Sequence, residues 1–457
     1  MQQNQAAPEY FNDSNKLLTL SNRRFSNRVL TFHHRITYGS IPLKDALLTL
    51  FHSKIQFEVF NSPIAKASDQ WTDLMSQSKV LEYLHSEMHQ RSESSVKAKS
   101  VAIVSFQNWS FIPSIERSLF HLGVKSFRIE ADRTLAVDFP NSLLQVIRQS
   151  LRLVLAERSN NEIHLRWKEN FEKQIQDAET VWVEWAQRSA VMVSRCDLGK
   201  RKLVVRLHSY ELSTPYVHLV NWARVDEIVV VSEIVKKVLP IAIPSAAGVP
   251  VRVIPNGVPF DGHVNDEKRN FQNIALVGWS NVAKDFRWAL KVLDELNLNS
   301  ADSTPTYSLH CFGSAPTPEH NDWFSSDDAK LVAKHVDEGS VVIRGWSDSV
   351  IEDLQDFGFI LSSSIRESFH VGLFEGISAG CVPVIRNWPY WQPLADAKCI
   401  FPSAHVVDSA NEAAQLIRAL SHDKDIWQAK RLEYHTWAKD LLNQDSIENA
   451  IRQAVTS

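Results

Sequence analysis

The segment IRESFHVGLFEGISAGCVPV, residues 365–384, decides the fold that we expect for this chain. It lies between two apolar runs, FGFILSS at 357–363 and CVPVI at 381–385, which predict buried strands. Between them, residues 370–374 predict a turn and the first turn of a helix. A helix start presents unpaired backbone N–H groups and the positive end of the helix dipole. The segment therefore predicts an anion site suited to a diphosphate.

Two carboxylates, Glu367 and Glu375, flank this expected anion site. They could accept hydrogen bonds from sugar hydroxyls on either side of a bound diphosphate. Taken alone, two glutamates at this spacing are more typical of a solvated helix face. The flanking strands and Gly372, which would allow a close backbone approach, favour the binding interpretation.

Glycines gather in the second half of the chain. The sequence has 14 glycines, and ten of them follow residue 250. Because glycine lets the backbone turn tightly or approach a ligand closely, we expect the phosphate site in this half.

Outward from this segment, short apolar runs alternate with amphipathic stretches, which predicts parallel sheets covered by helices on both faces. The first set of predicted strands is 101–106, 126–130, 180–185, 202–207, 227–232 and 251–255. A turn-rich linker at 256–270 precedes the second set, 273–278, 307–313, 340–345, 357–363 and 381–385. We expect an α/β protein with two Rossmann-like domains facing a central cleft, because ligands of such sheets bind at the carboxyl ends of the strands.

The expected domain organisation has four parts. Residues 1–95 form a basic, partly helical N-terminal extension, residues 96–255 a Rossmann-like acceptor domain, residues 256–430 a Rossmann-like donor domain, and residues 431–457 a helical tail. The first strand could alternatively be RVLTF at 28–32, because no glycine-rich loop follows the strand at 101–106.

Composition excludes several classes of protein. With 49 Lys and Arg against 53 Asp and Glu, the net charge of −4 argues against a nucleic-acid partner. The four cysteines form no C-x-x-C pair, so neither a disulfide framework nor a zinc site is expected. No apolar run approaches the ~20 residues that span a bilayer, and the N-terminus lacks a signal-peptide pattern. We expect a soluble, cytoplasmic protein whose basic stretch at 16–35 could contact the inner face of a membrane.

Several motifs together resemble the retaining GT-B-fold glycosyltransferases of family four (glycosyl transferases group 1). The two glutamates match the family's E-x7-E signature. VRVIPNGV at 251–258 is similar to its passage into the second domain, and ALVGWSNVAKDF at 275–286 to its first C-terminal strand and phosphate loop. VVIRGW at 341–346 is similar to the strand and loop that face the nucleotide base. The resemblance covers about residues 200–390 in the family's order.

The resemblance implies roles for individual residues. Lys284 would hold the donor diphosphate, Glu367 the hydroxyls of the transferred sugar and Glu375 the ribose hydroxyls. His208 would lie near the transferred sugar, with Glu211 as a weaker candidate. The remaining donor-binding candidates are the Gly278 turn, Arg366 and the backbone of His370, Val371, Gly372, Leu373 and Phe374.

One position departs from the family pattern. The family commonly has Arg directly after the glycine of the phosphate loop, where this chain has Trp279. This removes one expected phosphate contact, which Arg366 or Arg287 could replace.

The function implied is retaining transfer of a hexosyl-type unit from a UDP- or GDP-sugar to a hydroxyl of a glycan, a lipid-linked sugar or a protein, with no metal and no other cofactor. Trp279 and the missing glycine loop keep open a catalytically weak or inactive GT-B partner subunit. An inverting transferase or a sugar-nucleotide epimerase would need a carboxylate or His base in the first half. A GT-A transferase would use an Asp-x-Asp motif, whose only match, at 423–425, is a predicted surface turn. A nicotinamide dehydrogenase would need G-x-G-x-x-G, which is absent.

Overall fold

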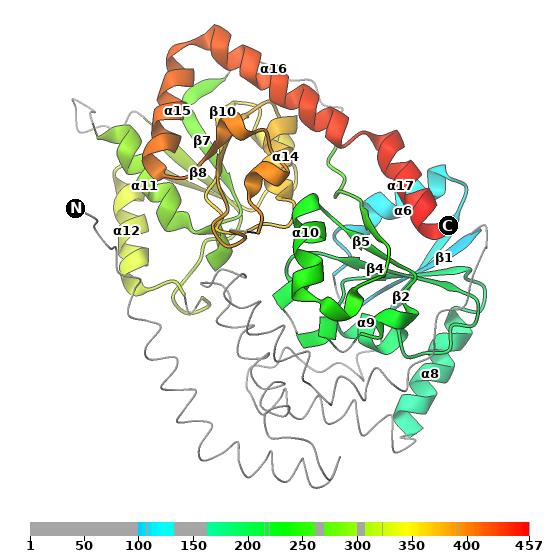
Figure 1. Ribbon diagram of the computed structural model, residues 1–457. Coiled ribbons are helices and arrows are strands. Elements are labelled where there is room, and N and C mark those ends of the chain that lie inside the picture. Colours follow the sequence, from blue (N-terminus) through cyan, green and yellow to red (C-terminus); the bar gives the residue numbers. More distant parts are fainter. Residues whose placement is uncertain are drawn as a thin grey trace, which may run out of the picture.

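A computed structural model describes residues 99–131, 162–260, 269–298 and 307–456, apart from positions 107, 214, 219, 322 and 393. The predictions for the N-terminal extension, residues 1–95, and for a strand at 28–32 lie outside the described residues. Within them the chain builds two α/β domains, each around a parallel six-stranded sheet (Figure 1). The expected α/β architecture of two Rossmann-like domains is confirmed.

The first sheet has the order β2-β1-β3-β4-β5-β6. Its strands are β1 (Ser100–Ser105), β2 (Lys125–Glu130), β3 (Thr180–Glu184), β4 (Lys202–Leu207), β5 (Glu227–Val230) and β6 (Val251–Val253). The central strands β3 and β4 are buried along their whole length, as expected for parallel strands covered on both faces. The connecting helices are α6 (Ile112–His121), α8 (Glu162–Gln174), α9 (Arg188–Val193) and α10 (Glu233–Ala242). All six predicted strands of this set are present.

The second sheet has the order β12-β11-β10-β7-β8-β9. Its strands are β7 (Asn270–Val277), β8 (Ser308–Phe312), β9 (Val341–Gly345), β10 (Phe357–Ser362), β11 (Val382–Arg386) and β12 (Val406–Val407). The sequence did not predict β12, a two-residue strand that pairs with β11. β7 begins at the end of the predicted linker, because the amide of Asn270 donates to Asp356 O at 2.8 Å and starts the pairing with β10.

This strand order positions the loops of the candidate site. β7 lies between β8 and β10, so the chain leaves β7 towards one side of the sheet and enters β10 on the other. Such a topological switch point opens a crevice outside the carboxyl ends of the two strands. The helices that follow are α11 (Phe286–Asn297) after β7 and α14 (Val371–Ser378) after β10. The candidate phosphate loop and the E-x7-E segment therefore meet at one edge of the sheet.

The chain ends on its first domain. After α12 (Ser326–Asp337), α13 (Val350–Asp353) and α15 (Ala410–His422), the long helix α16 (Lys424–Leu441) leads away from the second domain. The last helix, α17 (Gln444–Thr456), packs beside α6 (Figure 1). There Thr180 Oγ1 donates to Val455 O at 2.9 Å, and Gln444 Nε2 donates to Ser118 Oγ at 3.3 Å.

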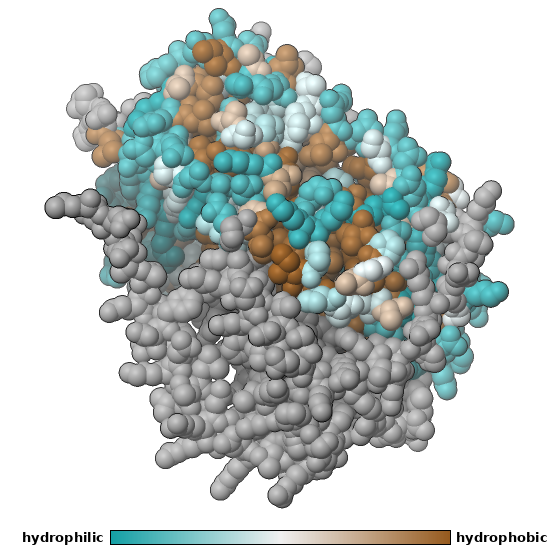
Figure 2. Space-filling view, in the orientation of Figure 1, coloured by the Kyte–Doolittle hydropathy of each residue, from teal (hydrophilic) through white to brown (hydrophobic). Residues whose placement is uncertain are grey.

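Hydrophilic and hydrophobic residues are mixed over the described part of the surface in Figure 2. Within the described residues, no helix is both long and apolar enough to cross a bilayer.

Candidate functional site

The loops after β7 and β10 bring Lys284 and Glu367 into contact. Lys284 Nζ lies 2.8 Å from Glu367 Oε1, and both side chains are largely but not completely buried. The sequence separates these residues by 83 positions, so their contact is a consequence of the β10–β7 pairing. The structure thus places two of the predicted site residues together at the switch point.

Gly278 shapes the space beneath Lys284. Its backbone is in the left-handed region at φ +73°, which glycine adopts without strain. A Cβ at this position would lie 3.5 Å from Lys284 Cε, so the lysine side chain extends directly over the glycine. The predicted Gly278 turn therefore supports the lysine that would contact a phosphate.

Hydrogen bonds hold the short loop that carries Lys284. Asn281 caps a 3₁₀ turn, Val282–Lys284, by accepting from the amide of Ala283 at 2.9 Å. Asp285 follows in the left-handed region at φ 39°, and Arg386 Nη1 donates to its carboxylate at 2.6 Å. Ser363 Oγ also donates to the carbonyl of Lys284. Because the backbone is held on both sides, the point from which the Lys284 side chain extends is fixed.

The surroundings of Glu367 keep its carboxyl charged. Burial would raise its pKa, but the Lys284 and His370 side chains and a hydrogen bond from Ser364 together lower the pKa to about 2. Ser364 Oγ donates to Glu367 Oε1 at 2.8 Å, and His370 Nε2 lies 3.9 Å from the same oxygen. Glu367 is therefore a carboxylate at neutral pH.

His370 begins helix α14 from a left-handed backbone position, at φ 68°. Its Nδ1 accepts from the amide of Leu373 at 3.2 Å, as an N-cap side chain does. Burial, helped by Lys284, lowers the pKa of His370 to about 3, so the ring is neutral. Since Nδ1 accepts a hydrogen bond, the ring proton is on Nε2, the nitrogen nearer Glu367.

In the predicted phosphate-binding segment from His370 to Phe374, fewer backbone amides are available to a phosphate than we expected. The amides of Leu373 and Phe374 donate to the His370 carbonyl at 3.0 and 3.4 Å, and both side chains are completely buried. These two residues belong to the core. The amides of Val371 and Gly372 have no acceptor among the described residues, so they are the ones that could meet a phosphate.

Gly372 and Gly376 let α14 approach the sheet closely. A Cβ on Gly372 would lie 2.8 Å from Val277 Cγ1 of β7, and a Cβ on Gly376 would overlap Ile360 of β10. The absence of a side chain at Gly372 is thus required by helix–strand packing, a reason that the sequence did not suggest.

Glu375 lies one helical turn after Val371 and is partly exposed. Burial raises its pKa, while the charge of Lys284 lowers it. Lys284 therefore acts electrostatically on both glutamates of the E-x7-E motif.

Trp279 cannot supply the phosphate contact that the family's arginine would make. Its indole is 2% exposed and packs edge-on against Phe286, with ring centroids 6.1 Å apart. Its Nε1 donates to Gly313 O at 3.4 Å. The side chain is part of the core of the second domain.

Of the two suggested replacements, Arg287 is engaged elsewhere. Its guanidinium binds the Asp328 carboxylate, with Nε to Oδ1 at 2.6 Å, and donates to Trp323 O at 2.9 Å, which ties α11 to α12. Arg366 is buried with its guanidinium 5.3 Å from the centre of the Tyr390 ring. Burial lowers the pKa of Arg366, while Tyr390, Glu367 and Tyr210 raise it. Since Tyr210 belongs to the first domain, Arg366 lies where the two domains meet.

In the first domain, His208 lies in an aromatic cluster at the carboxyl end of β4. Its ring stacks on Trp185, with centroids 4.2 Å apart, and on Phe111 at 5.1 Å. Its Nε2 lies 3.2 Å from Glu184 Oε1, and burial lowers its pKa. Within the described residues, His208 makes no hydrogen bond or ion pair with Lys284 or Glu367.

Sequence reasoning missed Glu184 and Trp185. Glu184 is completely buried, which would raise its pKa, but Arg206, His208 and Trp182 lower the pKa to about 2. Arg206 Nη1 donates to Glu184 Oε1 at 3.1 Å. The sequence did contain a signal for Glu184, because it is a glutamate within a strand predicted to be buried on both faces. A buried carboxylate requires a charged partner.

Glu211, the weaker candidate, supports the His208 loop. Its carboxyl accepts from the amides of His208 at 3.1 Å and Ala186 at 3.2 Å. Burial raises the pKa of Glu211 to about 8, so the group is largely protonated at neutral pH.

No cluster of three or more His, Cys, Asp or Glu side chains in the described ranges is arranged to hold a metal ion.

No protein-family model matches this sequence, and no curated protein sequence matches it either. Solved structures do resemble it. HepE from Anabaena, in complex with UDP and glucose, superposes with a TM-score of 0.56 at 12% identity, over 79% of this chain and 100% of HepE. Sucrose-phosphate synthase from Thermosynechococcus elongatus superposes with a TM-score of 0.55 at 14% identity, over 78% of this chain and 98% of the synthase.

A variant of TarM from S. aureus, in complex with Fondaparinux, alpha-GlcNAc-glycerol and UDP, superposes with a TM-score of 0.52 at 13% identity, over 64% of this chain. This chain spans 58% of the length of the TarM chain. At these identities the likeness concerns the fold. The two domains of this chain have the GT-B fold of glycosyltransferases.

Proposed function

We propose that this protein is a glycosyltransferase that transfers a sugar from a nucleoside diphosphate sugar to a hydroxyl acceptor. The observation that carries the proposal is the Lys284–Glu367 ion pair at 2.8 Å, next to the start of α14. A cation and a carboxylate at this switch point match the two parts of such a donor, a diphosphate and a sugar. The structural neighbours HepE and TarM, both in complexes that contain UDP, support this choice.

Lys284 and α14 would stabilise the leaving group. When the bond between sugar and phosphate breaks, negative charge develops on the diphosphate, and donors already aimed at that position lower the barrier. The Lys284 ammonium and the amides of Val371 and Gly372 are such donors. This arrangement needs no metal ion, so we propose a metal-independent reaction.

Glu367 would act as a permanent carboxylate. Burial opposes its charge, but Lys284, His370 and Ser364 lower its pKa to about 2, which excludes a general-acid role at neutral pH. It can accept hydrogen bonds from sugar hydroxyls and hold Lys284 in place until the diphosphate arrives. Glu375 would bind the ribose hydroxyls further along α14.

We further propose that the reaction retains the configuration of a hexosyl-type unit. The acceptor hydroxyl would attack from the face that the diphosphate leaves, and a phosphate oxygen would take its proton. His208, held by Glu184 and Trp185, would lie beside the transferred sugar. The acceptor would be a glycan, a lipid-linked sugar or a protein hydroxyl, reached in the cytoplasm or at a membrane surface.

The first test is thermal stabilisation of the purified protein by UDP, GDP, ADP and CMP. A ligand at about 100 times its Kd stabilises the folded state by about 2.7 kcal/mol. We expect one nucleotide to shift the wild type and to fail on Lys284→Ala. Glu375→Ala should mainly weaken nucleotide binding, and Glu367→Ala should mainly reduce turnover. No shift with any nucleotide, or equal and trivial effects of both glutamate variants, would contradict the proposal.

The alternative is a GT-B partner subunit with little or no activity of its own. The core position of Trp279 favours it, because the family that the sequence resembles commonly has an arginine there to contact the donor phosphates. A nucleotide that binds through Lys284 without detectable transfer or hydrolysis of any matching sugar donor would support this alternative.

A further inference from the structure

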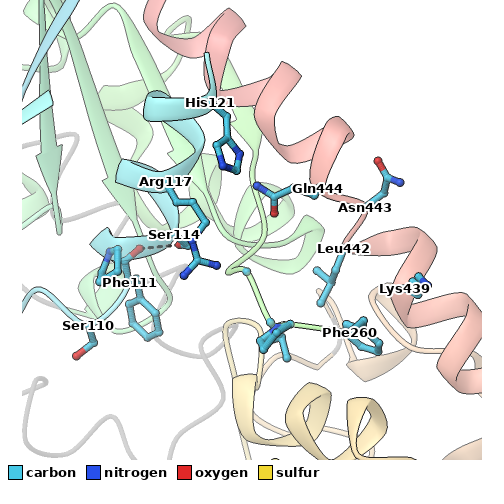
Figure 3. Close-up of a pocket in the computed structure, with 14 residues that line it drawn as sticks. Ser110, Phe111, Ser114, Arg117, His121, Phe260, Lys439, Leu442, Asn443 and Gln444 are labelled. Atoms are coloured by element: carbon cyan, nitrogen blue, oxygen red, sulfur yellow. Dashed lines mark hydrogen bonds between the residues drawn. The ribbon is translucent and has the colours of Figure 1, made fainter. Parts of the chain in front are cut away.

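A cavity of about 600 Å³, which we call the hinge cavity, lies beside the linker between the two domains. Helix α6 of the first domain forms one wall, the linker at Gly257–Phe260 forms another, and the junction of α16 with α17 closes the third side (Figure 3). This volume is within the range of small-molecule sites, about 300–1,000 Å³. The candidate donor residues Lys284, Glu367 and Glu375 do not line it.

The lining combines cationic and apolar side chains. Its residues are Ser110, Phe111, Pro113, Ser114, Arg117, His121, Gly257, Val258, Pro259, Phe260, Lys439, Leu442, Asn443 and Gln444. None of these described residues is acidic, although the whole chain carries a net charge of −4. The chemistry of the lining suits an anion with an apolar part.

The positive charges come from different walls of the cavity. Arg117 extends from α6 into the space in front of the linker (Figure 3). No hydrogen bond or ion pair from Arg117 or Lys439 to another described residue is present. Lys439 belongs to α16, which comes from the second domain. His121 differs, since its Nδ1 lies 2.7 Å from Glu448 Oε1. Arg117 and Lys439 therefore bring positive charge from both domains to the same cavity.

Two residues of the lining are in contact with candidate site elements, one in each domain. Phe111 lines the cavity, and its ring stacks on His208 with centroids 5.1 Å apart. On the other side, Ser378 Oγ of α14 donates to the carbonyl of Pro259 in the linker. A ligand in the cavity would press on residues that contact His208 and α14.

We propose that the hinge cavity is a binding site for an organic phosphate, separate from the donor site. Arg117 and Lys439 supply the positive charge that attracts the phosphate, and the apolar part of the lining, which includes Phe111, Phe260 and Leu442, receives the apolar group. Occupation ties α6 to α16 and so fixes the relative position of the domains, whose closure aligns reactants in two-domain enzymes.

The test is calorimetric titration of the full chain with phenyl phosphate, which has the charge and the apolar group together. Inorganic phosphate and benzyl alcohol are the probes for each part alone. Titration of Lys284→Ala separates the hinge cavity from the donor site. Arg117→Gln and Lys439→Gln remove the two cavity charges, and Lys291→Gln removes an exposed charge of α11 as the matched control.

We expect phenyl phosphate to bind the wild type, Lys284→Ala and Lys291→Gln equally, and more tightly than either partial probe. Arg117→Gln and Lys439→Gln should each weaken binding at least about tenfold, which equals about 1.4 kcal/mol. Because both side chains are exposed and bind no other described residue, these variants should fold normally, and thermal scans check this. No binding to the wild type, loss of binding in Lys284→Ala, or unchanged binding in both cavity variants would overturn the proposal.

Discussion

A double-mutant cycle on Lys284 and Glu367 tests the central feature of the candidate site. Glu367→Gln and Lys284→Met remove one charge each at nearly constant volume, and the third variant combines them. Burial raises the pKa of Glu367, and its partners lower it to about 2 from an ordinary 4.5. At about 1.36 kcal/mol per pH unit, the site favours the charged carboxyl by about 3 kcal/mol.

Urea unfolding at neutral pH measures the cycle. Each single variant leaves a charge without its partner, and we expect it to lose about 1–3 kcal/mol, whereas the double variant should lose no more than the worse single one. The coupling free energy should then be about 1–3 kcal/mol. Lys330 and Asp327 form a matched control pair at 2.9 Å on the solvent-exposed side of α12. A coupling no larger than that of the control pair would refute the role given to the Lys284–Glu367 pair.

The same variants predict opposite effects on nucleotide binding. In Glu367→Gln, Lys284 no longer has a carboxylate as its ion-pair partner. UDP or the matching nucleoside diphosphate should therefore bind more tightly, while turnover falls. In Lys284→Met the affinity should fall. Calorimetry measures both. Since the pKa of Glu367 is lowered in the folded state, its contribution to stability is present above pH 4.5 and is lost as the pH falls towards 2. Glu367→Gln should reduce this loss of stability at low pH.

Three further predictions concern the supporting structure. Gly376→Ala places a methyl group against Ile360 behind α14, and we expect the unfolding free energy in urea to fall by about 1–3 kcal/mol; an unchanged midpoint would contradict this packing. Trp279→Arg should lower the Tm without tightening nucleotide binding, because the side chain points into the core; a tighter Kd in calorimetry would show that position 279 reaches the phosphates. Burial raises the pKa of Glu211 to about 8, so the folded state keeps a proton that the unfolded state loses above pH 4.5. Stability should therefore fall as the pH rises from 4.5 to about 8, and Glu211→Gln should remove this fall in urea midpoints.

The strands of both sheets could be predicted because buried parallel strands read as continuous apolar runs. β12 was not predicted, because two residues are too few to show a hydrophobic period. Only its pairing with β11 defines it as a strand. The proximity of Lys284 and Glu367 followed from their places after two strands, although the sequence alone could not order those strands. The family resemblance assigned both residues to one donor site, and the structure supplies the strand order.

The structure adds to the reasons that we expected for two residues of α14. Gly372 was expected to admit a ligand, and its missing side chain also admits Val277 of β7. Leu373 was expected to offer an amide to a phosphate, but His370 caps that amide. The sequence could not separate these roles, since a helix start near a ligand and a helix packed on a sheet require the same residue types. Only the three-dimensional contacts tell which partner occupies the space.

The two halves of the candidate site are held in different ways, and this difference bears on how a substrate would enter. Trp185 keeps a left-handed backbone at φ 69°, which costs a non-glycine residue about 1 kcal/mol or more. The cost is offset because its ring packs on His208 and its Nε1 donates to Asn108 O at 3.1 Å. His208 is therefore fixed before any ligand binds. Lys284, in contrast, is held by one carboxylate that a diphosphate can replace. We infer that binding reorganises the donor side while the His208 side stays as it is.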